Sequence, residues 1–316
     1  MRYKRSESSV LKNKKQCSSS LRRRIYNENI VGYVFIAPFI IGFLVFTVYP
    51  LLSSLYLSFT KFSGLGTPEW IGLLNYKRMF FLDPRYIKSL KVTFVYVFIY
   101  VPLRLTFALI VAMLFKAGGR IIAAYRTMFY LPSVIGGSVA VAVVWRQLWG
   151  YDGVINRFLI SIGLMEEQFS FIGSKETALM TIIILAIWQF GSPMLVFIAG
   201  LKDIPMSLYE AATVDGANGW KKFWKITMPC LTPIIFFNLV NQLISGFMAF
   251  TQAFIITRGG PNDATMLYVV YLYEKSFTTF QMGYGSAMAW VLIVIVSILT
   301  AILFSTQNKW VYYGNE

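Results

Sequence analysis

Amides and hydroxyls are the main polar groups that interrupt the most apolar parts of this 316-residue chain. In the apolar stretch from residue 230 to 257 they are Asn238, Asn241, Gln242, Ser245 and Gln252. Positions 238, 242, 245, 249 and 252 would share one face of a helix, and an earlier apolar stretch contains the pair Trp188-Gln189. Aromatic faces packed on pyranose C–H groups, beside amides that bind hydroxyls, are the expected chemistry of a neutral sugar site.

The same polar residues have a second interpretation. Asn, Gln and Ser also hold membrane helices together through hydrogen bonds. A polar face left against lipid would be unsatisfied, so under either interpretation it should face a helix bundle or a wet cavity. Pro193 has no N–H to donate to the carbonyl of Gln189, so that oxygen should be free near the middle of its segment.

Catalytic chemistry is hard to assemble from this sequence. The chain has no histidine, which excludes histidine-based catalysis and histidine metal sites. Its two cysteines, Cys17 and Cys230, form no CxxC motif. No Gly-Lys dipeptide occurs, so there is no phosphate-binding P-loop. We therefore expect no catalytic residue, no metal and no cofactor in this chain, and ATP hydrolysis would need another protein.

Six stretches are long and apolar enough to cross a bilayer, which takes about 20 residues each. The chain is 57% hydrophobic and only 14% charged, so it has too little polar sequence to cover six buried helices in water. Arg104 and Arg146 are the only charged residues in these stretches. The sequence predicts an all-α multi-pass membrane protein with a transmembrane domain over 31–307 and spans at about 31–60, 92–115, 127–149, 178–200, 230–257 and 283–307.

The placement of the charges predicts the orientation of these spans. The net charge is +15, and a basic tail over residues 1–30 carries nine Lys and Arg. If this tail is cytoplasmic, seventeen basic residues outside the spans lie in the cytoplasm and ten on the other side, as the positive-inside rule requires. Six of those ten lie between Lys61 and Lys91 and weaken the asymmetry. The tail and the final segment 308–316 are therefore both predicted to be cytoplasmic. The tail could contact anionic lipid, and no nucleic-acid partner is expected.

Segment 201–229, on the cytoplasmic side, predicts a helical hairpin that projects from the membrane. Pro205 suits the first turn of a helix, and Gly216 should end that helix with a positive φ. Asn218 could cap a second short helix that is rich in aromatic residues. The small side chains of Ala211-Ala212 give the first helix a smooth face, suited to a groove on a partner.

This hairpin resembles the EAA loop of importer permeases in the ATP-binding-cassette superfamily. The matching residues are Glu210, Ala211, Ala212, Gly216, Ile226 and Pro229. The similarity covers nearly the whole chain, from Ala37-Pro38 and Tyr49-Pro50 to Gly259-Gly260-Pro261 and Tyr284-Gly285. It points to the carbohydrate branch, and within it to the first maltose-permease-like subunit.

The resemblance implies the importer-permease (MetI-like) fold, with six transmembrane helices and both termini cytoplasmic, in the bacterial cytoplasmic (inner) membrane. It also implies a heterodimer with a second homologous permease, above two ATPase subunits that bind ATP and Mg²⁺. An extracytoplasmic solute-binding protein would deliver the sugar. The loop helix with Glu210 would dock in a cleft of an ATPase, so this subunit would not itself be an enzyme although the assembled complex hydrolyses ATP.

The resemblance also implies where the substrate passes. Together with the polar helix face, it gives the candidate pathway residues Trp188, Gln189, Ser192, Asn241, Gln242, Ser245, Gly246 and Ala249. The maltose-type subunit has asparagines where this sequence has Gly246 and Ala249. We therefore expect a larger or differently lined cavity, and a cargo other than maltose.

Other functions stay open at this stage. Arg104 could attract an acidic saccharide or a glycerol phosphate-like solute, or it could simply bind backbone carbonyls, and we favour the structural role. A secondary transporter would usually carry a carboxylate within its spans for proton coupling, and none of the six has one. A membrane enzyme would need a nucleophile, a metal or an acid pair in the spans, and no such cluster is found.

Overall fold

The structure is a computed structural model that describes residues 28–312. The chain divides into two compact units, residues 1–56 and 57–316. Most of the predicted basic tail, with Cys17, and the last four residues lie outside the described residues.

The described part of the first unit is one helical segment. Helix α2 (Glu28–Phe43) continues through the π-helical turn η1 (Leu44–Val48) into α3 (Tyr49–Ser58). Residues Gly32–Ser58 are long and apolar enough to cross a membrane, in agreement with the first predicted span. The side chains of Phe35 and Phe46 are 80% and 81% exposed. A helix that is apolar on all sides needs lipid or another protein around it.

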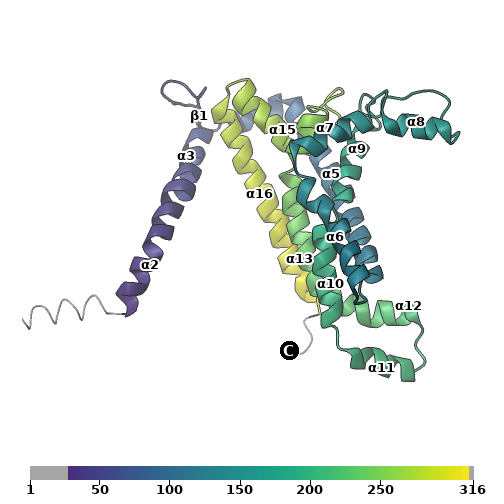
Figure 1. Cartoon of the computed structure of the whole chain (residues 1–316). Coiled ribbons are helices and arrows are strands. Elements are labelled where there is room, and N and C mark those ends of the chain that lie inside the picture. The colour runs from purple at the N-terminus through teal and green to yellow at the C-terminus, as the bar shows by residue number, and fades with distance from the viewer. Residues whose placement is uncertain (1–27, 313–316) are drawn as a thin grey trace, which may run out of the picture. The chain divides into compact units, whose positions relative to one another are not determined.

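The second unit is a helical bundle built around α5 (Pro84–Leu114). Helix α5 packs against α9 (Ala178–Trp188), α10 (Gly191–Asp203) and α13 (Met228–Phe247). Helix α6 (Arg120–Ile135) packs on α10, and α16 (Met282–Thr306) packs on α13 (Figure 1). Helix α5 can occupy this central place because it has a buried residue on nearly every turn. Its fully buried side chains include Tyr86, Tyr96, Val97, Tyr100, Ala108 and Ala112.

The number of spans depends on two bent helix pairs. Among the described residues, four helices are long and apolar enough to cross a membrane, and the number rises to six if each bent pair counts as one span. The predicted all-α membrane class is therefore confirmed. Helix α5 begins at Pro84 rather than near residue 92, because Asp83 caps it by accepting the N–H of Tyr86 at 3.1 Å.

The third predicted span, 127–149, is not one straight helix. Helix α6 and helix α7 (Val139–Leu148) meet at an angle of 98°. Gly136-Gly137 separates them, and Ser138 starts α7 by accepting the N–H of Val141 at 3.3 Å. The fourth predicted span is bent by 41° between α9 and α10, at Gln189 and Phe190, just before Pro193. A proline that removes a helical hydrogen bond is an ordinary cause of such a bend.

Shorter elements lie at both ends of this bundle. At the upper end in Figure 1 are α7, α8 (Val154–Ser161), α15 (Tyr268–Tyr273) and β1 (Thr60–Lys61). Strand β1 pairs antiparallel with β2 (Glu69–Trp70) and is followed by α4 (Leu74–Lys77) and η2 (Arg78–Leu82). The remaining elements of this unit are α14 (Thr251–Ile256), η4 (Glu274–Thr278) and η5 (Gln307–Lys309). Helices α11 (Met206–Val214) and α12 (Gly219–Lys222) lie at the lower end.

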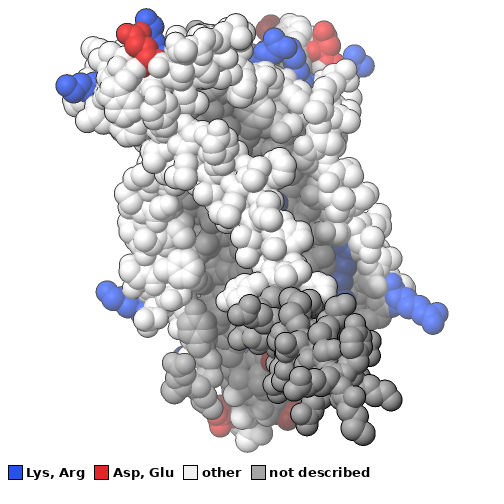
Figure 2. Space-filling model, turned by 90° about the vertical axis from the view of Figure 1, so that its left-hand side faces the viewer, with Lys and Arg blue, Asp and Glu red and all other residues white. Residues whose placement is uncertain are grey.

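The charged side chains of the described residues also lie mainly toward two ends (Figure 2). In Figure 2 the Lys, Arg, Asp and Glu side chains gather toward the top and bottom of the view, and the surface between them is largely uncharged. This is the distribution that a bilayer around the middle requires.

Candidate functional site

The predicted hairpin is present, formed by α11 and α12. Helix α11 ends in a Schellman motif, in which the N–H of Gly216 donates to the Thr213 carbonyl at 3.1 Å and that of Ala217 to the Ala212 carbonyl at 2.8 Å. Gly216 has φ of +70°, a left-handed conformation that favours glycine, as the sequence predicts.

The start of α12 also agrees with prediction, since the Asn218 side chain accepts the N–H of Lys221 at 2.9 Å. Pro205 differs by one position, because it lies before the first turn of α11 with ψ of 130°. The predicted boundary before the fifth span is absent. Helix α12 continues through the π-helical turn η3 (Phe223–Thr227) into α13, and the helical segment runs over Gly219–Ile256.

The outer surface of the hairpin has the composition of a contact surface. Glu210 is exposed, and its carboxylate forms no hydrogen bond or ion pair with another described residue. Ala211 is exposed and Ala212 is half-buried. Large apolar side chains are exposed on the same hairpin, among them Met206 at 68%, Val214 at 88% and Trp220 at 70%. Apolar residues exposed beside a free carboxylate are typical of a surface that binds a partner.

Tyr209 fixes α11 to the bundle. Its hydroxyl lies 2.9 Å from the Thr227 hydroxyl in η3, and the ammonium of Lys116 lies 4.7 Å from its ring centroid. Ile226, in the same π-helical turn, packs against the main core, and Pro229 lies in the first turn of α13. A displacement of α11 would therefore reach both the α5–α6 connection and the fifth span.

The carbonyl that Pro193 frees is not left unpaired. The Gln189 carbonyl accepts a hydrogen bond from the Arg104 guanidinium and one from the Ser133 hydroxyl at 2.7 Å. Ser133 also accepts the N–H of Ser192 at 3.0 Å. We call these four residues the Gln189 junction, since they tie α5, α6 and α10 together at the bend. Pro193 predicts the free carbonyl from the sequence alone, but no sequence pattern predicts the contact of Ser133.

Arg104 has further contacts but no counter-ion. Its guanidinium donates to the Tyr100 hydroxyl at 3.4 Å, and its centre lies 5.7 Å from the Tyr100 ring centroid. Tyr100 in turn donates to the Gln242 side-chain carbonyl at 2.8 Å, which joins α13 to the Gln189 junction. The Nε of Arg104 is buried without a hydrogen-bond partner, and no described carboxylate lies within 4 Å of the guanidinium. The positive charge is thus held by neutral dipoles.

The other candidate pathway residues are dispersed. Ser192, Asn241 and Ser245 are exposed, and Asn241 donates to the carbonyl of Phe237 in its own helix at 2.8 Å. Ala249 is half-buried, and Trp188 packs against Trp145 with ring centroids 6.0 Å apart. The Gln189 side chain is buried and donates to the Leu185 carbonyl at 3.1 Å.

Gly246 lies in a helix–helix contact. It is buried, and a Cβ at this position would come within 2.8 Å of the Tyr100 ring and 3.1 Å of Val97. Its small size allows α13 to approach α5 closely, which is a packing role.

Two other members of the predicted polar face donate hydrogen bonds to backbone carbonyls. Gln252 donates to the Gly136 carbonyl at 2.9 Å, at the bend between α6 and α7. Asn238 is buried and donates to the Ile234 carbonyl at 3.1 Å. At both bends, therefore, a side chain from another helix satisfies a backbone carbonyl that the bend exposes.

The upper end of the bundle is held by a half-buried carboxylate. Asp83 accepts hydrogen bonds from Tyr271 at 2.6 Å and Tyr284 at 2.8 Å, and Lys275 lies 4.0 Å away. Burial acts to raise the pKa of Asp83, but these hydrogen bonds, the Tyr86 N–H and the Lys275 charge together outweigh it and hold the pKa below its usual value. No pattern in the sequence predicts this role of Asp83.

An ion-pair cluster adds to this end. Arg85 bonds Asp263 at 2.9 Å and Glu274 at 2.7 Å, so the start of α5 is tied to the segment after α14. No group of three or more Cys, Asp or Glu that could hold a metal occurs among the described residues.

Proteins of known family resemble this chain over most of its length. The probable ABC transporter permease protein YesP of Bacillus subtilis (strain 168) is 56% identical over 296 residues, which cover 93% of this chain and 96% of that protein. The lactose transport system permease protein LacF of Rhizobium radiobacter is 32% identical, with 92% of this chain and 98% of that protein covered.

A solved structure has the same fold. It is the bacterial alginate ABC transporter in complex with an alginate pentasaccharide-bound periplasmic protein, and one of its chains matches with a TM-score of 0.79 at 22% identity. The match covers 91% of this chain and 96% of that one. A family model described as the binding-protein-dependent transport system inner membrane component matches residues 81–309. This chain is therefore a member of that family of multi-pass permease subunits.

Proposed function

We propose that this chain, paired with a second homologous permease, forms the translocation pathway for a sugar or oligosaccharide. An extracytoplasmic solute-binding protein would deliver the solute, and two ATPase subunits would bind ATP and Mg²⁺ and supply the energy. The chain itself would then have no catalytic role and no cofactor. Both termini and the hairpin 201–229 would be cytoplasmic, and the end with α7, α8 and α15 would face outward.

The names of relatives support a sugar as the solute. Besides the lactose permease, relatives at 29% and 32% identity are named for arabinooligosaccharides and sn-glycerol-3-phosphate. The alginate transporter is named for an acidic polysaccharide. Solutes rich in hydroxyls are common to all of these names.

The observation that carries the proposal is the free carboxylate of Glu210 on an exposed helix that is tied to the bundle through Tyr209. A coupling element needs an unoccupied contact surface and a firm connection to the spans. Docking of α11 against an ATPase would supply the first, and the contacts of Tyr209 with Thr227 and Lys116 would supply the second. Closure of the ATPases would then move α5 and α13 as rigid bodies.

The pathway would run along the exposed face of α13 and the start of α10. Ser192, Asn241 and Ser245 offer a hydroxyl or an amide there to the hydroxyls of a sugar. The Gln189 junction and Gly246 would hold the helices that carry these groups. Trp188, Gln189, Gln242 and Ala249 remain proposed pathway residues of the second rank, since their side chains are partly or wholly covered in this conformation.

The proposed pathway is tested by placing a bulky side chain at one exposed position. In proteoliposomes that contain the complete complex, Ser245→Trp should abolish ATP-dependent uptake while the complex still assembles. Ile298→Trp, at an apolar residue of α16 that is 55% exposed, is the matched control and should transport normally. Lactose, arabinotriose, an alginate trisaccharide and glycerol 3-phosphate form the initial set of solutes. Uptake driven by a proton gradient without ATP would instead identify a secondary transporter.

Arg104 favours a second, narrower candidate, an acidic saccharide or a glycerol phosphate-like solute. An intramembrane cation without a carboxylate partner attracts anions more strongly than neutral solutes. The test is the ratio of acidic to neutral uptake in Arg104→Gln. A selective fall for alginate trisaccharide and glycerol 3-phosphate supports an anion site, whereas an equal fall for all four solutes supports the structural role.

A further inference from the structure

Basic residues in the first outer loop run against the positive-inside asymmetry. The structure gives two of them partners: Arg85 bonds Asp263 and Glu274, and Lys88 donates to the carbonyl of Asn262. Lys61 and Arg78 are exposed and form no ion pair with a described residue. Lys77 and Lys91 are also exposed and form no ion pair with a described residue, so four positive charges remain without compensation in this segment, among them Lys61 and Arg78.

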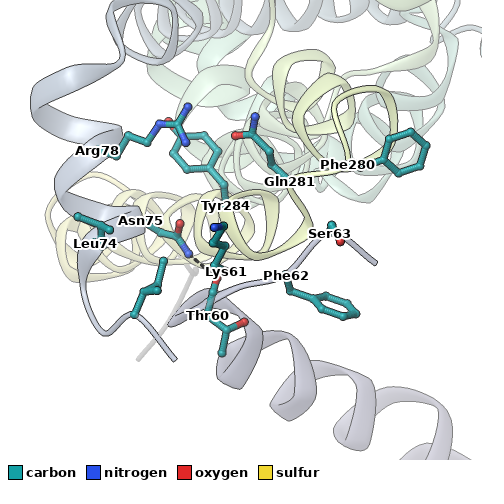
Figure 3. Close-up of a pocket in the computed structure, with 11 residues that line it drawn as sticks. Thr60, Lys61, Phe62, Ser63, Leu74, Asn75, Arg78, Phe280, Gln281 and Tyr284 are labelled. Atoms are coloured by element: carbon teal, nitrogen blue, oxygen red, sulfur yellow. Dashed lines mark hydrogen bonds between the residues drawn. The ribbon is translucent and has the colours of Figure 1, made fainter. Parts of the chain in front are cut away.

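These two cations line one pocket of about 340 Å³ (Figure 3). The pocket lies between the turn after β1, helix α4 and the start of α16. No Asp or Glu is among its lining residues, which include Lys61, Asn75, Arg78, Phe280, Gln281 and Tyr284. The pocket is therefore positively charged and partly apolar.

The walls of the pocket are fixed by backbone-directed hydrogen bonds. The Asn75 amide donates to the carbonyls of Ser58 and Thr60, each at 2.9 Å, and so joins α4 to the strand β1. The N–H of Gly283 donates to the Phe62 carbonyl at 3.1 Å and joins α16 to the same turn. The pocket is thus part of the folded unit and does not depend on a loose loop.

The nearest carboxylates do not neutralise the two cations. Glu69 is the cross-strand neighbour of Lys61 but forms no ion pair with it. Asp83 is engaged by Tyr271, Tyr284 and Lys275. The Arg78 guanidinium lies over the Tyr284 ring at 5.5 Å, a contact that leaves its N–H groups available. The Gln281 side-chain carbonyl, which also lines the pocket, has no hydrogen-bond partner and would accept from a hydroxyl.

The position of the pocket relative to the predicted spans indicates which kind of molecule it binds. Its lining residues Phe280, Gln281 and Tyr284 lie at the start of α16, so the pocket lies where a span begins, at the level of lipid headgroups. Large apolar side chains are exposed in its lining, Leu74 at 54% and Phe280 at 60%, and in η2, which begins at Arg78, Phe81 at 83% and Leu82 at 73%. Apolar side chains beside Lys and Arg are the composition of a segment that lies in the membrane interface.

We propose that Lys61 and Arg78 bind the phosphate of an anionic phospholipid with a hydroxyl-bearing headgroup, such as phosphatidylglycerol, in the outer leaflet. The headgroup enters the pocket, its hydroxyl faces Gln281, and its acyl chains run along the exposed apolar residues of α4 and η2. The site is distinct from the proposed translocation pathway and does not depend on which solute is carried.

Native mass spectrometry of the full-length protein, purified with its associated subunits, tests this site. Phosphatidylglycerol should remain bound after detergent washing, and phosphatidylcholine should not. Lys61→Gln/Arg78→Gln should weaken retention of phosphatidylglycerol roughly 30-fold, from two basic charges at the surface. Lys77→Gln, which removes a neighbouring exposed charge outside the pocket, is the matched control and should retain the lipid. The charge-conserving Lys61→Arg/Arg78→Lys should also retain it.

Several results would overturn the proposal. Equal retention of phosphatidylglycerol by the wild type and the double Gln variant would show that Lys61 and Arg78 do not bind it. An equal loss of the lipid in Lys77→Gln would show only a general attraction of the lipid to basic residues. Displacement of the lipid by millimolar inorganic phosphate would indicate a site for a free anion. The ATPase activity that the loaded binding protein stimulates can also be compared in phosphatidylglycerol and phosphatidylcholine nanodiscs. If the double Gln variant lowers this activity equally in both lipids, the pocket binds the binding protein and not a lipid.

Discussion

At the residue scale, the bends in the membrane-embedded helices explain why polar side chains occur there. A carbonyl without a partner in a lipid-surrounded bundle costs several kcal/mol. The Gln189 carbonyl has two donors, Arg104 and Ser133, and the Gly136 carbonyl has Gln252. Bent helices are tolerated because other helices supply these donors. Polar residues at such positions are therefore required by the fold, whatever else they bind.

Either of the two donors to the Gln189 carbonyl should suffice when the other is removed. Arg104→Met or Ser133→Ala alone leaves one hydrogen bond, so each should lower the free energy of unfolding by about 1 kcal/mol or less. The double variant leaves the carbonyl unpaired and should cost about 1–3 kcal/mol beyond the sum. Thermal unfolding of the purified protein gives these values. Arg146→Met with Ser133→Ala is the control pair, and its two free-energy changes should add. If the changes of Arg104→Met and Ser133→Ala also add, the two side chains do not share the Gln189 carbonyl.

Asp83 should make stability depend on acid pH. Its folded-state pKa lies below the unfolded value, so the unfolded chain binds more protons and stability falls as the pH drops below about 4. Asp83→Asn should lower stability at pH 7 and flatten the fall of the thermal midpoint between about pH 5 and pH 3. Asp215→Asn, an exposed carboxylate at the opposite end, should keep the wild-type slope. A wild-type slope in Asp83→Asn would exclude this carboxylate as the cause.

At the element scale, the sequence predicted best what depends on local backbone chemistry. The positions of Gly216 and Asn218 determine where α11 ends and α12 begins, and both were predicted correctly. The bend of 98° between α6 and α7 was missed, because an apolar stretch of 23 residues looks the same whether or not Gly136-Gly137 breaks it. Gly246 was predicted to line the pathway from the resemblance to the maltose-type subunit; the structure shows its close contact with α5, and its place on the pathway stays a prediction.

The end of α11 should be sensitive to side-chain shape at one residue. Gly216→Val places a β-branched residue at φ of +70°, at a cost of about 1–2 kcal/mol, and should shift the hairpin. We expect loss of transport and weaker co-purification of the ATPase, with normal insertion in the membrane. Gly219→Ala, in the same hairpin at an ordinary helical position with open space around it, should transport normally. Normal uptake by Gly216→Val would show that transport does not depend on the geometry of the hairpin.

At the scale of the whole molecule, the two ends of the second unit carry different chemistry. The lower end presents a free carboxylate and exposed apolar residues on a short hairpin. The upper end is held by Asp83 and the ion pairs of Arg85, and it carries the unpaired cations Lys61 and Arg78. This asymmetry fits an importer that meets ATPases on one side and a solute-binding protein on the other. In the proposed orientation, the basic residues between Lys61 and Lys91 lie on the outer side.

The orientation can be measured with single cysteines in a variant that lacks Cys17 and Cys230. Leu65 is 86% exposed at the upper end, and Trp220 is 70% exposed at the lower end. In intact cells an impermeant thiol reagent should label Leu65→Cys and leave Trp220→Cys unlabelled. After permeabilisation both should react at similar rates, which controls for accessibility. The reverse labelling would turn the protein over. It would place the hairpin outside, where no ATPase can reach Glu210, and the proposed coupling would fail together with the orientation.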